Sequence, residues 1–402
     1  MRFKAENYGP QAYIDIELGD MITLFVGSNN TGKSFVSRAI YAILKSCKGS
    51  KCDTDTLATL LLNSSIASAK DLWVLSRNFN GRFSLILEDK DSIKIKIDYD
   101  RNRHNPLAIE IEGDIKAFPL LYAPSYRVTS LGLTYMFAAY VIEFRDLLQK
   151  LISQIITAFG GMEEKGFPMI ETLFTGSNTD LLNNFVKTLL SAIKPLIEQR
   201  EEVLKAAVIT LSPTILDVSI AIRTAEKTVI DDHLRTMFKK LFPEFPYKAL
   251  GFYSERADLP EIPPYLLSSG MIQTLPLLCL LNLALQYIKQ GYERVLVFID
   301  EPEINLEMLR QTIFSRALMD FIYATYREGR KISVVIATHS DFITYSITQW
   351  LARSNLRNLA RVYEFKPGGI EEREIDEHGE VEIEAFSKAI RKVFFEEEFK
   401  EE

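Results

Sequence analysis

Short, almost wholly apolar runs alternate with amphipathic segments in both the first and the last third of the chain. Such runs occupy residues 22–26, 118–124, 294–299 and 332–337. They are typical of strands buried on both faces of a parallel sheet. Helical periodicity follows the first and third of them, at 35–44 and 306–326. Strands that alternate with helices in this way predict an α/β fold with a largely parallel sheet.

Other stretches alternate apolar and charged residues and predict strands with one solvated face. Residues 83–87 and 93–97 flank a highly charged turn, which predicts an antiparallel hairpin. A short extended run lies at 13–16, and a second hairpin is expected around residues 367–369. A last helix is expected to run into the acidic residues at 396–398. The fold class expected is therefore α/β with a mixed sheet.

The middle of the chain has a different character. Residues 128–249 predict helices at 135–159, 180–208 and 229–241, without sustained heptads, so we expect a helical insertion and no long coiled coil. The domain organisation predicted is one discontinuous domain formed by residues 1–127 and 250–402, interrupted by this insertion.

One apolar stretch raises the question of a membrane. Residues 271–288 carry no charge and approach the ~20 residues that span a bilayer. They include several polar residues, so a buried core helix is the better interpretation, and no membrane span is expected. Residues 1–9 lack the apolar region of a secretion signal. We expect a cytoplasmic protein whose three cysteines, Cys47, Cys52 and Cys279, are reduced thiols.

The composition is that of an ordinary globular protein, and the net charge is informative only when the C-terminal residues are counted separately from the rest. The 402 residues are 47% hydrophobic, with a net charge of −7. Residues 371–402 hold 13 acidic and 5 basic residues, which leaves 42 basic and 41 acidic residues in the rest. The acidity belongs to the C-terminal end, so net charge does not argue against contact with nucleic acid.

The strongest chemical signal is a glycine-rich loop between the strand at 22–26 and the helix at 35–44. Its residues are Gly27, Ser28, Asn29, Asn30, Thr31, Gly32, Lys33 and Ser34, followed by Phe35. They match G-x-x-x-x-G-K-[ST], whose backbone N–H groups surround phosphate oxygens at the start of a helix. Lys33 would reach the β- and γ-phosphates, and the Ser34 hydroxyl would bind Mg²⁺. The loop predicts a nucleoside triphosphate site, with ATP and Mg²⁺ as the cofactors.

Polar residues also follow two other predicted strands. Asp300 and Glu301 end the strand at 294–299, where ligands bind in open α/β sheets. Asp300 is predicted to hold the metal ion, and Glu301 to orient or deprotonate the attacking water. His339 follows the strand at 332–337, and its imidazole could hydrogen-bond the γ-phosphate.

A further anion site is expected where the uncharged helix begins. Ser268, Ser269 and Gly270 would offer a hydroxyl and free N–H groups at a helix N-terminus, although an ordinary serine cap is the simpler alternative. One phosphate does not need two such sites in one chain. A second copy of the chain could supply this one in trans, enclosing ATP between two subunits.

Together these motifs resemble those of ABC-type ATPases, and more closely those of the AAA-family P-loop ATPases of the OLD, RecF and SMC kind. The order of the phosphate loop, residues 267–270, the segment 300–303 (Asp-Glu-Pro-Glu) and residues 338–340 carries the resemblance. Residues 122–127 are similar to the Pro-x-x-Arg segment of OLD-like members. We expect no added TOPRIM nuclease domain, because the segment that follows His339 here is short.

The resemblance implies an ABC-ATPase-like head that closes head to head on two ATP molecules and opens on hydrolysis. It implies that Lys33, Glu301 and His339 act in catalysis, as phosphate ligand, general base and switch histidine. Ser34 and Asp300 would bind the metal. The chain departs from the family at Ser269, where a glycine is usual, and no glutamine can be assigned as a further magnesium ligand.

Three functions fit these features. The first is a dimeric switch ATPase in DNA maintenance or antiviral defence, acting with a separate effector protein. The others are a nucleotide-locked scaffold with little turnover, which the altered signature allows, and a transporter-type nucleotide-binding subunit, against which the insertion argues. DNA is a candidate partner because Arg353, Arg357 and Arg361 recur every four residues, as in a basic stripe on a helix. A solvated helix face is the alternative.

Overall fold

The computed structural model describes residues 1–63, 69–89, 93–113, 118–125, 215–253, 260–262 and 266–386. The chain divides into two compact units, one formed by Met1–Gly132 with Ser212–Glu402 and the other by Leu133–Leu211. All described residues belong to the first unit. The helices predicted at 135–159 and 180–208, and the end of the last helix, lie outside the described residues.

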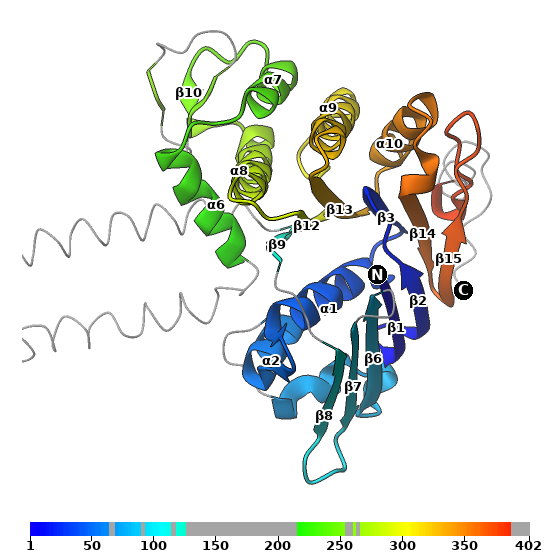
Figure 1. The fold of residues 1–402 in the computed structure, drawn as a ribbon. Helices are drawn as coiled ribbons and strands as arrows, with labels where there is room; N and C mark the ends of the chain where they lie inside the picture. The colour runs from blue at the N-terminus through cyan, green and yellow to red at the C-terminus, as the bar shows by residue number, and fades with distance from the viewer. Residues whose placement is uncertain are drawn as a thin grey trace, which may run out of the picture. The chain divides into compact units, whose positions relative to one another are not determined.

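A six-stranded sheet runs through the first unit and contains the strands predicted from the apolar runs (Figure 1). Its order is β15 (Gly369–Arg373), β14 (Ala360–Lys366), β3 (Ile22–Gly27), β13 (Lys331–Thr338), β12 (Arg294–Asp300) and β9 (Leu120–Ala123). Neighbours are parallel except for β14 and β15, which form the predicted C-terminal hairpin. The mixed α/β fold expected from the sequence is confirmed.

Helices cover this sheet on one face, and a second sheet with α1 lies on the other (Figure 1). The first layer is α8 (Ser269–Lys289), α9 (Met308–Arg327) and α10 (Asp341–Arg353). On the opposite side lie α1 (Lys33–Ser46), α2 (Thr54–Leu62) and the antiparallel strands β2 (Gln11–Glu17), β1 (Arg2–Tyr8), β6 (Arg82–Asp89), β7 (Ile93–Asp100) and β8 (Leu107–Gly113). Alternate residues of the central strands, such as Leu296 and Phe298 of β12, share a buried core with α1. Both faces of the sheet are covered, which explains the continuous apolar runs.

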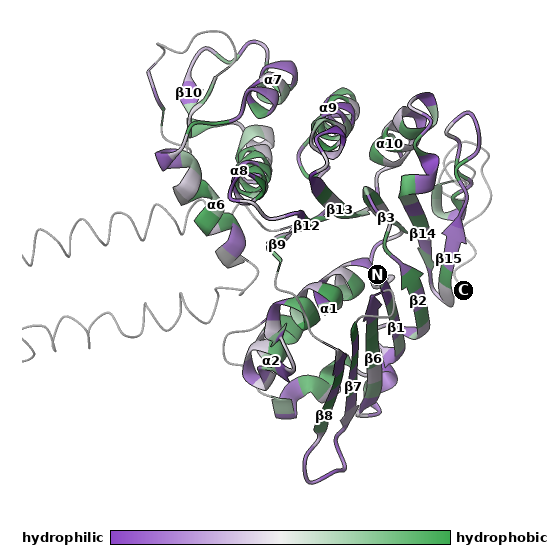
Figure 2. Ribbon diagram, in the orientation of Figure 1, coloured by the Kyte–Doolittle hydropathy of each residue, from purple (hydrophilic) through white to green (hydrophobic). Residues whose placement is uncertain are grey.

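The uncharged stretch forms α8, which is hydrophobic along most of its length (Figure 2). Among the described helices it alone is long and apolar enough to cross a membrane, and 83% of its apolar window is buried inside the protein. Leu275, Leu278 and Leu281 are fully buried. The structure thus uses α8 as a core helix, as predicted.

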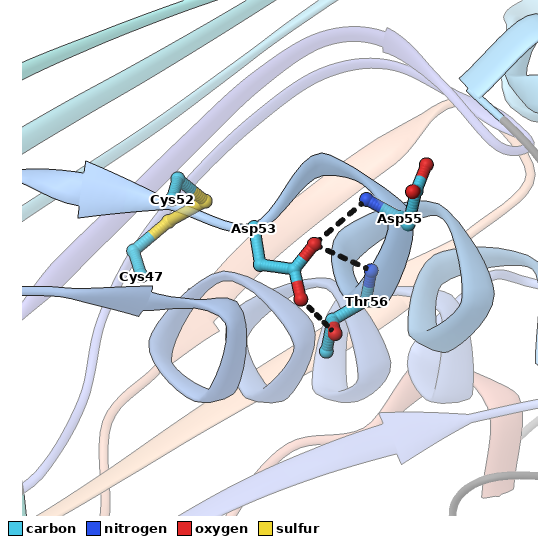
Figure 3. Close-up of a disulfide and its surroundings, with 5 residues drawn as sticks. All are labelled: Cys47, Cys52, Asp53, Asp55 and Thr56. Carbon is cyan, nitrogen blue, oxygen red and sulfur yellow. Dashed lines mark hydrogen bonds between the residues drawn. A yellow bond between two sulfur atoms is a disulfide. The ribbon is translucent and has the colours of Figure 1, made fainter.

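The expectation that all three cysteines are reduced thiols is wrong for two of them. Cys47 ends α1 and is joined by a disulfide to Cys52, across the short hairpin β4 (Cys47–Lys48) and β5 (Lys51–Cys52) (Figure 3). Asp53 follows directly and caps α2 by accepting from the N–H of Asp55, at 3.1 Å. The bond closes the turn between α1 and α2. Disulfides are uncommon in cytosolic proteins, and a spacing of five residues was too unspecific to predict this one.

The basic stripe proposed for three arginines is also wrong, because they do not share a helix. Arg353 is the last residue of α10, Arg357 lies in a short 3₁₀ turn, and Arg361 lies in β14. Asn355 adopts a left-handed conformation with φ 56°, which ends the helical path between the first two. Equal spacing in the sequence therefore does not place these side chains on one face.

Two helices of the expected insertion are described, and they pack on other helices of the first unit. These are α6 (Ile215–Lys227), which lies against α8, and α7 (Asp232–Leu241), which lies against α9. In α6 the buried Asp217 accepts hydrogen bonds from the Tyr41 hydroxyl at 2.6 Å and from Lys45 at 3.1 Å. Burial raises the pKa of Asp217, against the opposing effect of Lys45. The division at residues 128 and 249 stays a prediction.

Candidate nucleotide-binding site

Three neighbouring parallel strands end at one edge of the central sheet and bring the predicted motifs together. The strand β3 ends at Gly27, β13 at Thr338 and β12 at Asp300. In the register, Thr338 lies opposite Val26, and Asp300 opposite Ala337. The phosphate loop, the acidic pair and His339 therefore leave the sheet side by side, at the edge where ligands bind in open α/β folds.

The two glycines of the phosphate loop occupy positions that other residues would strain. Gly27 has φ 136°, and a Cβ there would lie 2.3 Å from the carbonyl oxygen of Phe365. Gly32 has φ 101°, and a Cβ there would lie 2.8 Å from Cγ of Pro10. Both the left-handed backbone and the close neighbours require glycine. The loop is thus built for the backbone path that the motif predicts.

Lys33 and a residue from a distant strand hold the loop in shape. The Lys33 ammonium donates to the carbonyl oxygens of Gly27 at 2.8 Å and Ser28 at 2.6 Å. The buried Gln11 side chain donates to the carbonyl oxygens of Thr31 at 2.8 Å and Lys366 at 3.0 Å. Gln11 was not expected from the sequence, because nothing in the motif indicates that a residue of β2 contacts the loop.

The electrostatics of Lys33 reflect its place in the site. Burial lowers the pKa of its ammonium, and the charges of Glu301, Glu303 and Asp300 act in the opposite direction. The N–H donors of the Lys33 ammonium point toward the loop. A further negative charge could therefore pair with this cation on the side of the loop. This arrangement suits phosphate oxygens enclosed by the loop.

Asp300 and Ser34, the two residues expected to bind a metal, are hydrogen-bonded to each other. Burial raises the pKa of Asp300 to about 6, while hydrogen bonds from Tyr122 and Ser34 and the charge of Arg38 lower it. A carboxylate and a hydroxyl in contact are hard oxygen donors of the kind that Mg²⁺ prefers, so this pair fits the ion. When bound, the ion would neutralise charge on the β- and γ-phosphates.

Tyr122 is a functional candidate that sequence reasoning did not identify. Its hydroxyl donates to Asp300 Oδ2 at 2.6 Å, and its backbone N–H donates to Asp217 at 3.1 Å. The side chain is buried and stacks on Phe298. Its place in the Tyr-Ala-Pro sequence was visible, but its contact with a residue 178 positions away was not.

We expect Tyr122→Phe to raise the Mg²⁺ concentration needed for half-maximal nucleotide binding by about 10-fold or more. A hydrogen bond to a charged group contributes ~1.5–3 kcal/mol, and here it fixes the orientation of the carboxylate. Titration of ATP binding against Mg²⁺ measures the effect. Tyr41→Phe is the matched control, because its hydroxyl bonds to Asp217. An equal shift in both variants would show a general structural effect instead.

Two glutamates follow β12, Glu301 and Glu303, and they have different surroundings. Glu301 adopts φ 46° and lines the same cavity, of about 670 Å³, as Lys33 and Ser34. Glu303 is buried and accepts from the Thr338 hydroxyl and the His339 N–H, each at 2.8 Å. It also lies 3.1 Å from His339 Nδ1. Glu303 has no assigned role in the sequence-based prediction, and its contacts show that it holds the histidine.

The third predicted element, residues 268–270, lies elsewhere. Ser268 caps α8, accepting from the Met271 N–H at 3.4 Å, so the helix begins where it was predicted. Together with Ser269 and Gly270 it lines a separate cavity of about 510 Å³, which Asn305 and Arg310 also line. Within one chain the structure therefore does not bring this segment to the phosphate loop.

Part of the chain matches a known protein family. Residues 173–344 match a family model described as "AAA domain, putative AbiEii toxin, Type IV TA system". The match contains residues 268–270, Asp300, Glu301 and His339, and it does not extend to the phosphate loop. No curated protein sequence matches the chain.

Among solved structures, the chain is similar to two SMC heads and to RecF. The SMC head domain from Thermotoga maritima is 11% identical, with a TM-score of 0.39, over 93% of this chain and 98% of that one. The SMC head bound to the C-winged helix domain of ScpA is 12% identical, with a TM-score of 0.38, over 92% and 95%. The recombination mediator RecF with ATP is 13% identical, with a TM-score of 0.38, over 92% and 98%.

The phosphate loop and the acidic strand end meet in one cavity, as expected of a P-loop nucleotide-binding domain. Residues 173–344 are in addition similar to an AAA-domain family.

Proposed function

We propose that this protein is an ATP-hydrolysing switch whose two copies close on two ATP molecules. The observation that carries the proposal is the cavity shared by Lys33, Ser34 and Glu301, with Asp300 in contact with Ser34. These groups supply a phosphate ligand, two metal ligands and a base at one sheet edge. In this proposal Lys33 and the loop N–H groups bind the phosphates, and Glu301 takes a proton from the attacking water.

The separate position of residues 268–270 supports closure by a second copy. A helix N-terminus that offers N–H groups to a phosphate needs an anion, and the phosphate loop of its own chain lies in another cavity. Exposed apolar side chains lie close in the sequence to the residues that line this cavity: Leu266 is 64% exposed, Met308 64% and Leu309 70%. Apolar side chains beside an anion-binding helix end are suited to burial in an interface.

The dimer is tested by measuring molecular mass in solution with ATP and Mg²⁺. We expect the mass to double when hydrolysis is blocked, and Leu309→Ser to raise the dimer dissociation constant by about 10-fold or more, since burying one leucine contributes ~1.5–3 kcal/mol. Val229→Ser is the control, because Val229 is 78% exposed and lies between α6 and α7. A mass that does not respond to ATP would contradict the proposed dimer, and an equal effect of the two serines would contradict the proposed interface.

The wider role that we propose is action in the cytoplasm, in DNA maintenance or antiviral defence, with a separate effector protein that responds to the closed dimer. The match to a family described by a toxin system supports the defence branch. DNA remains a candidate partner, although the arginine spacing that suggested it does not form a helical stripe. The second candidate, a nucleotide-locked scaffold, is favoured by Ser269 at the start of α8, where the family has glycine.

A further inference from the structure

The rim of the nucleotide cavity contains an aromatic side chain that the phosphate chemistry does not use. The cavity is lined by the phosphate loop and also by Val74 and Phe79. Phe79 is 67% exposed, among the most exposed of the large hydrophobic side chains in the described part of the chain. Exposing a phenylalanine this far forgoes the free energy that burial of its side chain would contribute.

The loop that carries Phe79 is tightly held, so its exposure does not reflect a loose segment. Ser76 is buried, its hydroxyl donates to the carbonyl oxygen of Trp73 at 2.6 Å, and it accepts from the Gly81 N–H at 2.8 Å. The Phe79 N–H donates to the carbonyl oxygen of Ser76 at 3.0 Å. Next to this loop, the Gly9 N–H donates to the carbonyl oxygen of Leu75 at 2.7 Å, tying it to the β1–β2 turn that also lines the cavity.

The backbone at this point is strained. Asn78 and Phe79 have φ values of 55° and 53°, in the left-handed region that non-glycine residues rarely adopt. Two such residues in succession cost free energy, and such strain is typically retained at ligand-binding sites. Here the strained pair includes Phe79, whose exposed ring lines the cavity instead of packing in the core.

The ring is also supported from one side. Trp73 lies edge-on to Phe79, with ring centroids 6.2 Å apart and an interplanar angle of 66°. The Arg101 guanidinium carbon lies 4.6 Å from the Trp73 centroid and fixes the tryptophan in turn. One edge of the Phe79 ring is therefore packed, and most of its surface remains open to a ligand.

We propose that Phe79 stacks on the base of the bound nucleotide, with Val74 against its edge. The inference rests on the proposed function, since it requires the triphosphate to lie in the phosphate loop. The loop and these apolar side chains line one cavity of about 670 Å³, and a purine is a flat, apolar-faced group at the other end of a nucleoside triphosphate from the γ-phosphate. A ring face reads no hydrogen-bond pattern, so it selects purine over pyrimidine nucleotides by stacking area and not ATP over GTP.

The experiment compares ATP with inorganic tripolyphosphate, which has the phosphates but no base. We expect Phe79→Ala to weaken ATP binding by about 5- to 150-fold, from the ~1–3 kcal/mol of one base–aromatic stack, and to leave tripolyphosphate binding unchanged. Phe79→Trp should retain ATP affinity within about 3-fold, because it keeps a stacking face. Both affinities are measured by isothermal titration calorimetry with Mg²⁺ present.

Tyr292→Ala is the matched control. Tyr292 is 43% exposed and lies edge-on to Tyr287 with centroids 5.8 Å apart, so it resembles Phe79 away from the cavity. Unchanged ATP affinity in Phe79→Ala would overturn the stacking role, as would an equal loss of ATP and tripolyphosphate affinity, which would mean that the loop had collapsed. A wild-type chain that binds neither compound would overturn the proposed function itself.

Discussion

Glu301→Gln is expected to slow ATP hydrolysis by about 10²- to 10⁴-fold while ATP binding persists. The amide keeps the size of the side chain and its place in the cavity with Lys33 and Ser34, but it cannot accept the proton of the attacking water. The backbone conformation, with φ 46°, is as accessible to Gln as to Glu. Loss of turnover with retained binding is the signature of a missing general base.

Single-turnover hydrolysis of labelled ATP at saturating protein separates this outcome from the alternatives, because binding and product release do not limit it. Glu293→Gln is the control, since Glu293 is exposed just before the opposite end of β12. A Glu301→Gln rate equal to that of the wild type would remove Glu301 from the mechanism. A wild-type chain that binds ATP without hydrolysing it would favour the nucleotide-locked scaffold.

Lys33→Ala is expected to weaken ATP binding by about 10- to 150-fold, whether or not the protein hydrolyses ATP. The estimate follows from the ~1.5–3 kcal/mol of a hydrogen bond to a charged group. The bonds from Lys33 to Gly27 and Ser28 also shape the loop, so part of the loss reflects a less ordered phosphate site. The measurement is a calorimetric titration with ATP.

Lys48→Ala serves as the control for Lys33→Ala. Lys48 is exposed and lies just past the end of α1, the helix that Lys33 begins. A thermal unfolding curve for each variant shows whether the fold is retained. Wild-type ATP affinity in a folded Lys33→Ala chain would mean that nucleotides do not use this loop.

Features that depend only on residues close together in the sequence could be predicted from it. The phosphate loop needs only a buried strand, two glycines and a helix start, all within residues 22–44, and the structure confirms each. The helix at residue 269 and the hairpin β6–β7 are equally local. Their signals come from backbone geometry and solvent exposure over a few residues, which the order of amino acids fixes directly.

The parts that escaped prediction depend on contacts between distant positions. Gln11 reaches Thr31 and Lys366 only because β2 folds beside the loop, and Tyr122 reaches Asp300 only through the pairing of β9 with β12. Phe79 gave no signal, since an aromatic residue in a connecting segment is more often buried. The arginine spacing misled for the same reason, because a helical period has meaning only while the helix continues.

The hydrogen bond from the Tyr122 N–H to Asp217 has a consequence for how the chain can vary. It joins, at 3.1 Å, two residues that are 95 positions apart, one before and one after the second unit in the sequence. The entropy of closing such a loop grows only with the logarithm of its length, so a segment twice as long costs about 0.6 kcal/mol more to close. We therefore expect the stability of the first unit to change little with the number of residues between the two ends, so that insertions and deletions there leave the sheet intact.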